Sequence, residues 1–309
     1  MTSKAGSRRY GAILHLPPRG TLVASTDLHG NLPDFECLEQ RFRTLMSTEG
    51  DAYLLFCGDL VHGPIYSRKQ WPRRLGTYYP DQSAEVIERF VALREEFPGR
   101  VFSLLGNHEH SHLGGPHTRK FHKVPSETEF FEQTVGAARA DEIRLLFATF
   151  PIVCVAGRGL VFTHGAPRVI KADIDEVASV RYTSVSCKKI HEMYQTPVLG
   201  ELLWCRQAGP LVIRRFLRRM EIDGQRNGVV LYGHDPVSNG FDIRSAEQIC
   251  FSTSFALKNK MKVYAELDLA REYRSAYDLR PGLELRHLYP DEADESSPLM
   301  AGIQASSSD

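Results

Sequence analysis

Five short polar segments in this chain each follow an apolar run that is typical of a β-strand. They are Asp27-Leu28-His29, Gly58-Asp59, Gly106-Asn107-His108-Glu109, His164-Gly165 and Gly233-His234. No single local structure requires this order, so the common position after a strand is the informative feature. Polar groups at the carboxyl ends of strands in an α/β sheet meet at the same edge. The pattern therefore predicts that the loops converge at one sheet edge.

The apolar runs alternate with helical patterns along most of the chain. Predicted strands cover 21–26, 52–57, 101–105, 152–155, 160–163, 229–232, 248–252 and 262–267. Predicted helices cover 34–46, 83–96, 126–138 and 140–148, and the pattern between 164 and 229 is mainly helical. The alternation, with no internal repeat and no interior linker, predicts one α/β domain over residues 21–289. Residues 1–20 are interpreted as an N-terminal extension, and the acidic, Ser-rich residues 290–309 as a disordered tail.

Composition limits the compartment and the main partners. Lys and Arg number 38, as do Asp and Glu, so net charge favours neither nucleic acid nor an anionic membrane as a partner. The apolar stretch at 11–17 is too short and interrupted for a signal peptide, and no window approaches the ~18 apolar residues of a membrane span. Six scattered cysteines without a C-x-x-C pair are expected to be free thiols. We therefore expect a cytoplasmic protein.

The residue types in the five segments are those of a site for two metal ions. The candidate ligands are Asp27 and His29 for a first ion, Asn107, His164 and His234 for a second ion, and Asp59 as the bridge between them. This set suits manganese, iron and zinc. Two divalent ions carry more positive charge than two carboxylates and a hydroxide neutralise, so the site would attract a phosphate dianion. The chain is thus a candidate phosphoester hydrolase.

His108 directly follows the candidate ligand Asn107 and is free to protonate the leaving oxygen as a general acid. A nucleophile activated by metal ions makes a covalent enzyme intermediate unnecessary. The sequence therefore predicts direct hydrolysis with His108 as the catalytic residue.

The five motifs together resemble those of the calcineurin-like metallophosphoesterases over residues 21–255. Within that superfamily they are most similar to the phosphoprotein phosphatases, because Glu109 completes Gly-Asn-His-Glu and a Glu-Leu-Leu-Trp stretch ending at Trp204 precedes Arg206. Pro236 stands where the nuclease and cyclic-nucleotide branches carry a second metal-binding His. The resemblance implies a sandwich of two mixed β-sheets flanked by helices.

The same resemblance implies an activity and its cofactors. It indicates a Ser/Thr protein phosphatase that uses two divalent metal ions, with manganese expected in vitro, and a metal-bridging hydroxide as nucleophile. The substrate would be a phosphoprotein or a phosphorylated small molecule. Arg206 matches a phosphate-contacting Arg of the bacterial and phage-type members, so it is the candidate phosphate anchor.

The second motif departs from the family. Family members carry Gly-Asp-x-Val-Asp-Arg-Gly, in which the second Asp holds the general-acid His and the Arg grips phosphate. Here His62 stands at that Asp position and Gly63 at the Arg position. Glycine cannot replace a bidentate Arg. His62 is interpreted either as a partner of His108 or as a substrate contact, with a neutral, hydrogen-bonded loop histidine as the alternative.

Two other functions remain open. One is a hydrolase of dinucleoside polyphosphates such as diadenosine tetraphosphate, because close relatives with this activity share the same metal ligands. The other is a non-catalytic scaffold with the same fold, although the intact ligand positions and His108 favour an enzyme.

Several polar and aromatic stretches lie outside the motifs. Residues 65–79 are basic and aromatic, and are interpreted as a capping excursion or as a surface for a phosphopeptide or nucleobase. The histidines at His110, His112, His117 and His122 fit no compact ligand set, so a solvated loop is expected over 110–126. The arginines Arg214, Arg215, Arg218 and Arg219 are expected on a solvated helix face.

Overall fold

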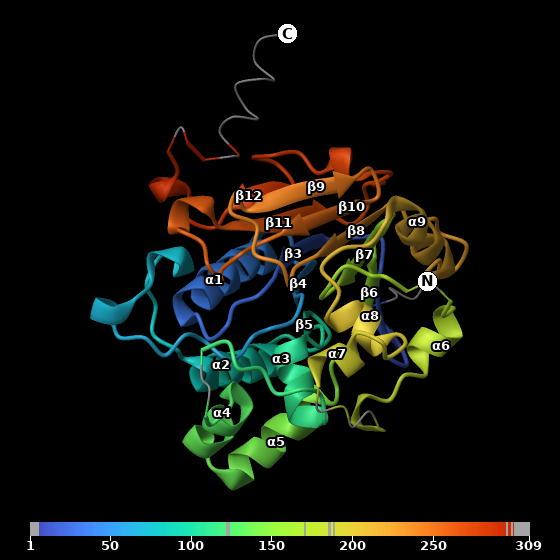
Figure 1. Ribbon diagram of the computed structural model, residues 1–309. Coiled ribbons are helices and arrows are strands. Elements are labelled where there is room, and N and C mark those ends of the chain that lie inside the picture. The colour runs from blue at the N-terminus through green and yellow to red at the C-terminus, as the bar shows by residue number, and fades with distance from the viewer. Residues whose placement is uncertain are drawn as a thin grey trace.

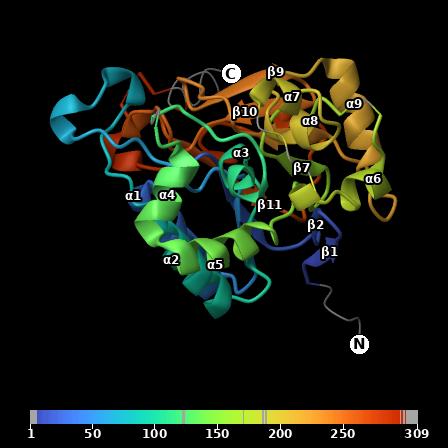
Figure 2. The same cartoon turned by 60° about the horizontal axis from the view of Figure 1, so that its bottom comes forward.

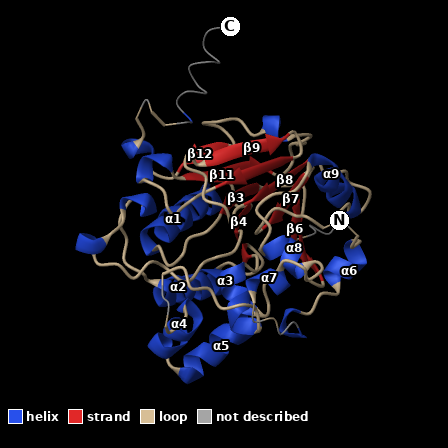
Figure 3. Cartoon of the chain, viewed as in Figure 1, coloured by secondary structure: helices blue, strands red, loops and turns tan. Residues whose placement is uncertain are grey.

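The computed structural model describes residues 6–121, 124–169, 171–184, 187, 189–294, 296–297 and 299. Two mixed β-sheets form the centre of the fold, and helices lie along their sides (Figure 1). Figure 3 shows the strands gathered together with the helices around them. This is the α/β sandwich of two mixed sheets with flanking helices that the resemblance implies.

The five-stranded sheet has the order β12-β11-β3-β4-β5. Its parallel strands are β3 (Thr21–Ser25), β4 (Ala52–Phe56) and β5 (Val101–Ser103). Strand β11 (Val263–Asp268) pairs antiparallel with β3, and β12 (Leu285–His287) pairs antiparallel with β11. The strands predicted at 21–26, 52–57, 101–105 and 262–267 are confirmed within two residues, whereas β12 has too short an apolar run to be recognised from sequence.

The seven-stranded sheet has the order β1-β2-β6-β7-β8-β10-β9. Its strands are β1 (Arg8–Tyr10), β2 (Ile13–Leu16), β6 (Val153–Ala156), β7 (Leu160–Thr163), β8 (Val229–Tyr232), β9 (Phe241–Ser245) and β10 (Gln248–Phe251). Strands β7 and β8 are parallel neighbours. Residues 8–10 and 13–16, which lie in the predicted N-terminal extension, thus form strands of this sheet, and every residue of β2 is buried.

Helices cover the sheets and fill the long connections. They are α1 (Leu32–Thr48), α2 (Ser83–Glu96), α3 (Asn107–His110), α4 (Glu127–Val135), α5 (Ala137–Phe147), α6 (Ile174–Ala178), α7 (Ile190–Met193), α8 (Leu199–Leu203) and α9 (Pro210–Arg219). Single 3₁₀ turns occupy Arg68–Gln70, Arg73–Leu75, Ser111–Leu113, Tyr182–Ser184, Asn259–Met261, Ala276–Asp278 and Pro290–Glu292. The predicted helix at 83–96 is confirmed at both ends. The side chain of Asn31 caps α1 by accepting from the backbone N–H of Asp34 at 3.2 Å.

The core has two layers because successive side chains of a strand point to opposite faces of the sheet. In β4, Tyr53 and Leu55 belong to the buried cluster that joins the two sheets. Leu54 and Phe56 of the same strand belong to the cluster under the helices, where Phe56 stacks on Phe35 of α1 with ring centroids 5.2 Å apart. Both faces of the strand are therefore covered, which explains its continuous apolar sequence.

Other expectations concern cysteines, membrane spans and the tail. All six cysteines are free thiols, as expected. Among the described residues, no helix combines the length and the apolar character needed to cross a membrane. The tail predicted from residue 290 begins with a 3₁₀ turn, and Lys260 Nζ lies 2.7 Å from Asp294 Oδ2. Most of the remaining tail, residues 300–309 included, lies outside the described residues.

Candidate metal centre and active site

The predicted segments follow strands of both sheets. Asp27 follows β3 and Asp59 follows β4, whereas His164 and His234 follow β7 and β8 of the other sheet. The backbone N–H of His234 donates to Asp27 Oδ2 at 2.9 Å and so ties the two groups of loops together. Figure 2 shows α3, which begins at Asn107, near the middle of the view with α4 and α5 on one side and α7 and α8 on the other. The loops converge as predicted, but where two packed sheets meet.

The backbone at this centre adopts conformations that residues other than glycine seldom take. Five of its residues have a left-handed backbone with φ between +46° and +69°, namely Asp27, His29, Asp59, His62 and His234. Gly233 allows two of these loops to touch, because a Cβ atom there would lie 2.2 Å from Asp27 Oδ2. Such strain persists only where the surrounding structure holds it, which is typical of functional sites.

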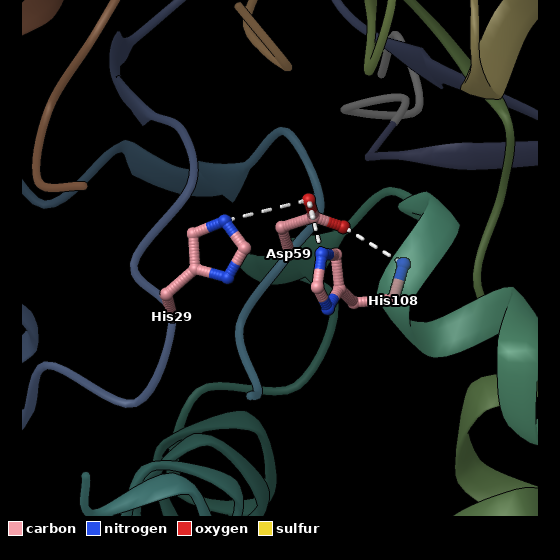
Figure 4. Close-up of side chains that lie close together, drawn as sticks. All are labelled: His29, Asp59 and His108. Carbon is pink, nitrogen blue, oxygen red and sulfur yellow. Dashed lines mark hydrogen bonds and ion pairs between the residues drawn. The ribbon is translucent and has the colours of Figure 1, made fainter. Parts of the chain in front are cut away.

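One carboxylate oxygen lies at the centre of the site. Asp59 Oδ2 is 3.7 Å from His29 Nε2, 3.9 Å from His108 Nε2 and 3.4 Å from His164 Nε2. Figure 4 shows the rings of His29 and His108 on either side of this carboxylate. The side chains of all four residues are at most 4% exposed. Asp59 therefore lies among all three imidazoles, and its role as the bridging ligand stays a prediction.

The second group of predicted ligands brings three polar side-chain atoms close together. His164 Nδ1 donates to the backbone carbonyl of Cys57 at 2.8 Å, because a carbonyl can only accept, so His164 Nε2 carries no proton. That nitrogen faces Asn107 Oδ1 at 2.9 Å and His234 Nδ1 at 3.1 Å. The Nε2 atom of His234 is buried without a hydrogen-bond partner in the described part of the chain. His164 Nε2 and Asn107 Oδ1 are thus two acceptors that face each other in a buried site, and a cation would relieve their repulsion.

The first group shows the same chemistry. His29 Nδ1 donates to the backbone carbonyl of His62 at 3.2 Å, which leaves the lone pair of His29 Nε2 to face two carboxylates. These carboxylates are Asp59 at 3.7 Å and Asp27 at 4.0 Å. Burial and the nearby Asp27 raise the pKa of the Asp59 carboxyl well above its ordinary value. A bound cation would relieve both the repulsion and the cost of burial.

The donor set therefore fits two divalent ions. Within the described residues, two groups of donor atoms lie within 4.8 Å of one another, one with His29, Asp59 and His108 and one with Asp59, His164 and His234. Asp59 belongs to both groups. Oxygen and imidazole donors in this number suit manganese, iron or zinc.

A comparison with protein families agrees with this chemistry. A sequence profile described as calcineurin-like phosphoesterase matches residues 20–264. This chain belongs to that family. Membership implies a centre with two divalent metal ions, and the phosphoesterase carries the residues to hold them. No curated protein sequence matches the chain.

Solved structures with a similar fold include phosphatases. A protein serine/threonine phosphatase from Saccharomyces cerevisiae is 18% identical, with a TM-score of 0.54 over 79% of this chain and 71% of that chain. The cold-active protein-tyrosine phosphatase of a psychrophilic Shewanella species is 14% identical, with a TM-score of 0.54 over 84% of this chain and 80% of that chain. At these identities the likeness shows the fold alone.

Glu109 links two of the ligand loops of the phosphoesterase. Its carboxylate accepts from the backbone N–H groups of Asp59 and Gly106 at 2.9 Å each and of Leu60 at 2.7 Å. Burial and the charge of Asp59 raise the pKa of Glu109 to about 7. From the sequence, Glu109 was only part of a motif. The structure shows that it holds the Asp59 loop against the Asn107 loop.

His108 and His62 lie side by side. The backbone N–H of His108 donates to Asp59 Oδ1 at 3.0 Å, and its ring Nδ1 is 2.9 Å from His62 Nδ1. Burial, together with the neighbouring rings of His29 and His62, lowers the pKa of His108 well below its ordinary value. The structure thus places His62 against the candidate acid, which agrees with its interpretation as a partner of His108.

Arg206 lies beside a ligand loop with part of its side chain in solvent. Its Nη1 atom donates at 2.9 Å both to the backbone carbonyl of His234 and to Asp235 Oδ1. The side chain is 46% exposed, so an anion at the metal centre can reach the guanidinium. The predicted phosphate anchor therefore lies at the rim of the site.

A second cation at this rim was missed from the sequence. Lys120 Nζ lies 3.6 Å from the ring centroid of Phe255, and that ring contacts His29 with centroids 4.7 Å apart. Desolvation lowers the pKa of Lys120, while the carboxylates of Asp59 and Asp27 act in the opposite direction. Lys120 as a whole residue is exposed, but its Nζ atom lies against the face of the Phe255 ring, where it is less hydrated. No motif marks Lys120, although it lies only 12 residues after His108 in the sequence.

The expectation of a solvated loop over 110–126 is wrong for two of its histidines. His110 and His112 are buried, and the side chain of His112 is only 1% exposed. The residues around them belong to α3 and the following 3₁₀ turn, which pack under α4 and α5. His117 contacts Ser126 Oγ through Nδ1 at 3.0 Å. His122 lies outside the described residues.

The other two stretches singled out from the sequence are occupied by internal contacts or face solvent. In the 65–79 segment, Trp71 Nε1 donates to the backbone carbonyl of Gly76 at 3.0 Å, and its ring contacts Tyr78 and Tyr79. Its aromatic rings thus pack on one another, and these contacts do not decide between the capping and the substrate-binding interpretations. On α9, three of the four arginines, Arg214, Arg215 and Arg218, are exposed, as expected.

Proposed function

We propose that this phosphoesterase is a Ser/Thr protein phosphatase. The observation that supports this substrate class is the position of His108, whose Nε2 lies 3.9 Å from Asp59 Oδ2 and whose Nδ1 contacts His62. A serine or threonine side chain leaves as a strongly basic alkoxide, so its departure needs a proton from the enzyme. A buried and oriented general acid is what an alkyl phosphate requires.

The residues of the centre have two separate roles, metal binding and proton donation. Asp27, His29, Asp59, Asn107, His164 and His234 would hold the two divalent ions. When bound, these ions supply positive charge to the phosphate oxygens and lower the pKa of a water molecule between them. His108 donates its Nε2 proton to the leaving oxygen, so the N–H bond breaks, the O–H bond forms and a neutral imidazole is left. A phosphate dianion beside the ring favours the imidazolium form before this transfer.

Arg206 and Lys120 would bind the phosphate oxygens that face solvent. Both cations lie close enough to Asp59 to affect the pKa of its carboxyl. They come from opposite sides of the centre, Arg206 beside His234 and Lys120 beside His29 through Phe255. We propose that Arg206 and Lys120 together replace the phosphate-binding Arg that the family carries at the position of Gly63.

The proposal is tested by parallel assays with manganese supplied. We expect faster hydrolysis of phosphoserine and phosphothreonine peptides than of diadenosine tetraphosphate or a phosphotyrosine peptide. Faster turnover of the dinucleotide would assign the enzyme to dinucleoside polyphosphates. Two bound metal ions with no hydrolysis of p-nitrophenyl phosphate would favour the scaffold.

The variant His108→Ala tests the assigned acid. We expect both metal ions to be retained and the rate on a phosphoserine peptide to fall by about 10²–10⁴-fold, the usual contribution of general acid catalysis. The rate on p-nitrophenyl phosphate should fall much less, because its leaving group needs little protonation. His191→Ala, at an exposed histidine of α7, is the matched control. Loss of a metal ion in His108→Ala would make His108 a ligand instead.

A further inference from the structure

An unbroken row of contacts runs from His108 away from the metal centre. His108 Nδ1 lies 2.9 Å from His62 Nδ1, and His62 Nε2 lies 2.9 Å from His112 Nε2. His112 Nδ1 lies 2.8 Å from Glu132 Oε1. The row ends at Arg144, whose Nη1 is 2.6 Å from the same carboxylate oxygen. Four segments distant in sequence thus meet in one hydrogen-bonded line.

The far end of the row determines which nitrogen of each ring carries a proton. Hydrogen bonds from His112 and Arg144 lower the pKa of Glu132 to about 2, so its carboxylate can only accept. His112 therefore carries its proton on Nδ1 and presents a lone pair at Nε2. His62 must then donate from Nε2 and accept at Nδ1. As a result, His108 donates from Nδ1, and its Nε2 is left for the metal centre.

The packing around the row leaves little freedom for the rings. The ring of His112 contacts Phe131 and Phe147 with centroids 5.5 Å apart in each case, and the ring of His62 contacts Phe131 at 5.9 Å. The imidazoles of His62 and His112 are buried, so water does not compete for their nitrogens. Hydrogen bonds in such surroundings orient their partners strongly.

We propose that Glu132, acting through His112 and His62, fixes the tautomer and orientation of His108. Glu132 and His112 are positioning residues, because they reach His108 through His62. The proposal rests on the proposed function in assigning the acid to His108. It deepens that function by explaining how an acid can be held when position 62 carries an imidazole instead of a carboxylate.

The first experiment compares leaving groups in the variants Glu132→Gln and His112→Ala. We expect the rate on a phosphoserine peptide to fall about 10-fold or more, a part of the ~10²–10⁴-fold that a general acid contributes. The rate on p-nitrophenyl phosphate should change by less than about threefold, because only the protonated leaving group depends on His108. Glu142→Gln, which removes an exposed carboxylate on α5, is the control and should alter neither rate. An equal fall on both substrates would show a structural role and overturn the proposal.

The second experiment reads the tautomer without using activity. In the zinc-loaded protein, long-range ¹H–¹⁵N spectra of the histidine rings should show His108 with its proton on Nδ1, and His108→Ala assigns the signal. In Glu132→Gln the single tautomer should be lost. If Glu132→Gln loses the single tautomer that the wild type shows, but the wild type hydrolyses no phosphoester, the row is supported and the proposed function is wrong. If it hydrolyses phosphoesters but Glu132→Gln leaves the tautomer unchanged, only the row is wrong.

A third variant makes the row unnecessary. In His62→Asp, a carboxylate oxygen stands as many bonds from the backbone as Nδ1 of His62, so it can accept directly from His108. Asp tolerates the left-handed backbone at this position, where φ is +69°. We expect His62→Asp to remain active and to be insensitive to Glu132→Gln. If Glu132→Gln lowers the rate on a phosphoserine peptide equally in the wild type and in His62→Asp, the proposal is overturned. Coupling between these positions is expected only along the row.

Discussion

His164 Nε2 lies 2.9 Å from Asn107 Oδ1, and both atoms are hydrogen-bond acceptors. The proton of His164 is on Nδ1, which donates to the carbonyl of Cys57. Two lone pairs this close repel each other in a buried site, so the folded protein without cations is less stable than it is with them. We therefore expect metal binding and folding to be coupled in this phosphoesterase.

Chelation is expected to lower the thermal unfolding temperature. Ions that bind only the folded state stabilise it by about 2.7 kcal/mol at a concentration of 100 times Kd. Thermal unfolding with manganese and with excess EDTA measures the difference. In Asp59→Asn, which weakens the ligand shared by both groups, the shift caused by manganese should be largely lost. Asp141→Asn, at an exposed residue of α5, is the control and should keep the full shift. Equal shifts in all three proteins would contradict metal binding at this centre.

The two cations at the rim should act on phosphate affinity. Lys120→Met and Arg206→Met are each expected to weaken inhibition by inorganic phosphate about tenfold, because a charge-assisted hydrogen bond contributes roughly 1.5–3 kcal/mol. KM for a phosphopeptide should rise in parallel, while the metal content stays unchanged. Lys189→Met, at an exposed lysine paired with Glu192, should leave both constants unchanged. An unaltered inhibition constant in Lys120→Met would remove Lys120 from the phosphate site.

The candidate metal ligands could be proposed from sequence because each one lies within a few residues of the end of an apolar strand. Asp59 and His164 stand in short motifs whose residue types and position are local properties of the chain. Their neighbourhood was not predictable in the same way. The contact between His112 and Glu132 joins a 3₁₀ turn to α4, and the contact between His62 and His112 joins residues 50 positions apart. Nothing local marks such pairs, so His112 was assigned to solvent although it is buried.

Strand recognition failed for a similar reason. Strand β1 is fully exposed and β12 is only three residues long, so neither has the apolar period that identifies a strand. Strand β2 does have an apolar run, but the sequence alone indicates only that this run is too short for a signal peptide. Its parallel pairing with β6 gives it a place in the sheet. Pairing with strands that are distant in sequence therefore determines where β1, β2 and β12 form.

Restoring an arginine at Gly63 should not restore phosphate binding. A Cβ atom at this position would lie 2.6 Å from the backbone oxygen of His29 and 2.7 Å from Asp81 Oδ1. Gly63→Ala is therefore expected to destabilise the protein by about 1–3 kcal/mol, as overpacking typically does. Gly63→Arg should be at least as unstable, with no gain in phosphate affinity. Urea unfolding measures the first effect, and Gly6→Ala, where a Cβ meets nothing within 4 Å, is the control. Tighter phosphate binding by Gly63→Arg would contradict the expectation.

The buried ring of His110 should make stability depend on pH. Burial lowers the pKa of His110 from 6.5 to about 4, so between these values the unfolded chain takes up a proton that the folded protein does not. The free energy of unfolding is therefore highest, with respect to this group, above pH 6.5. It decreases as the pH falls toward 4, by about 3 kcal/mol in all. His110→Leu should reduce this loss, whereas His191→Leu at an exposed site should not. Urea unfolding of the three proteins, with a chelator present throughout so that metal binding does not contribute, measures the slopes. The same slope in His110→Leu as in the wild type would show that other groups cause the acid sensitivity.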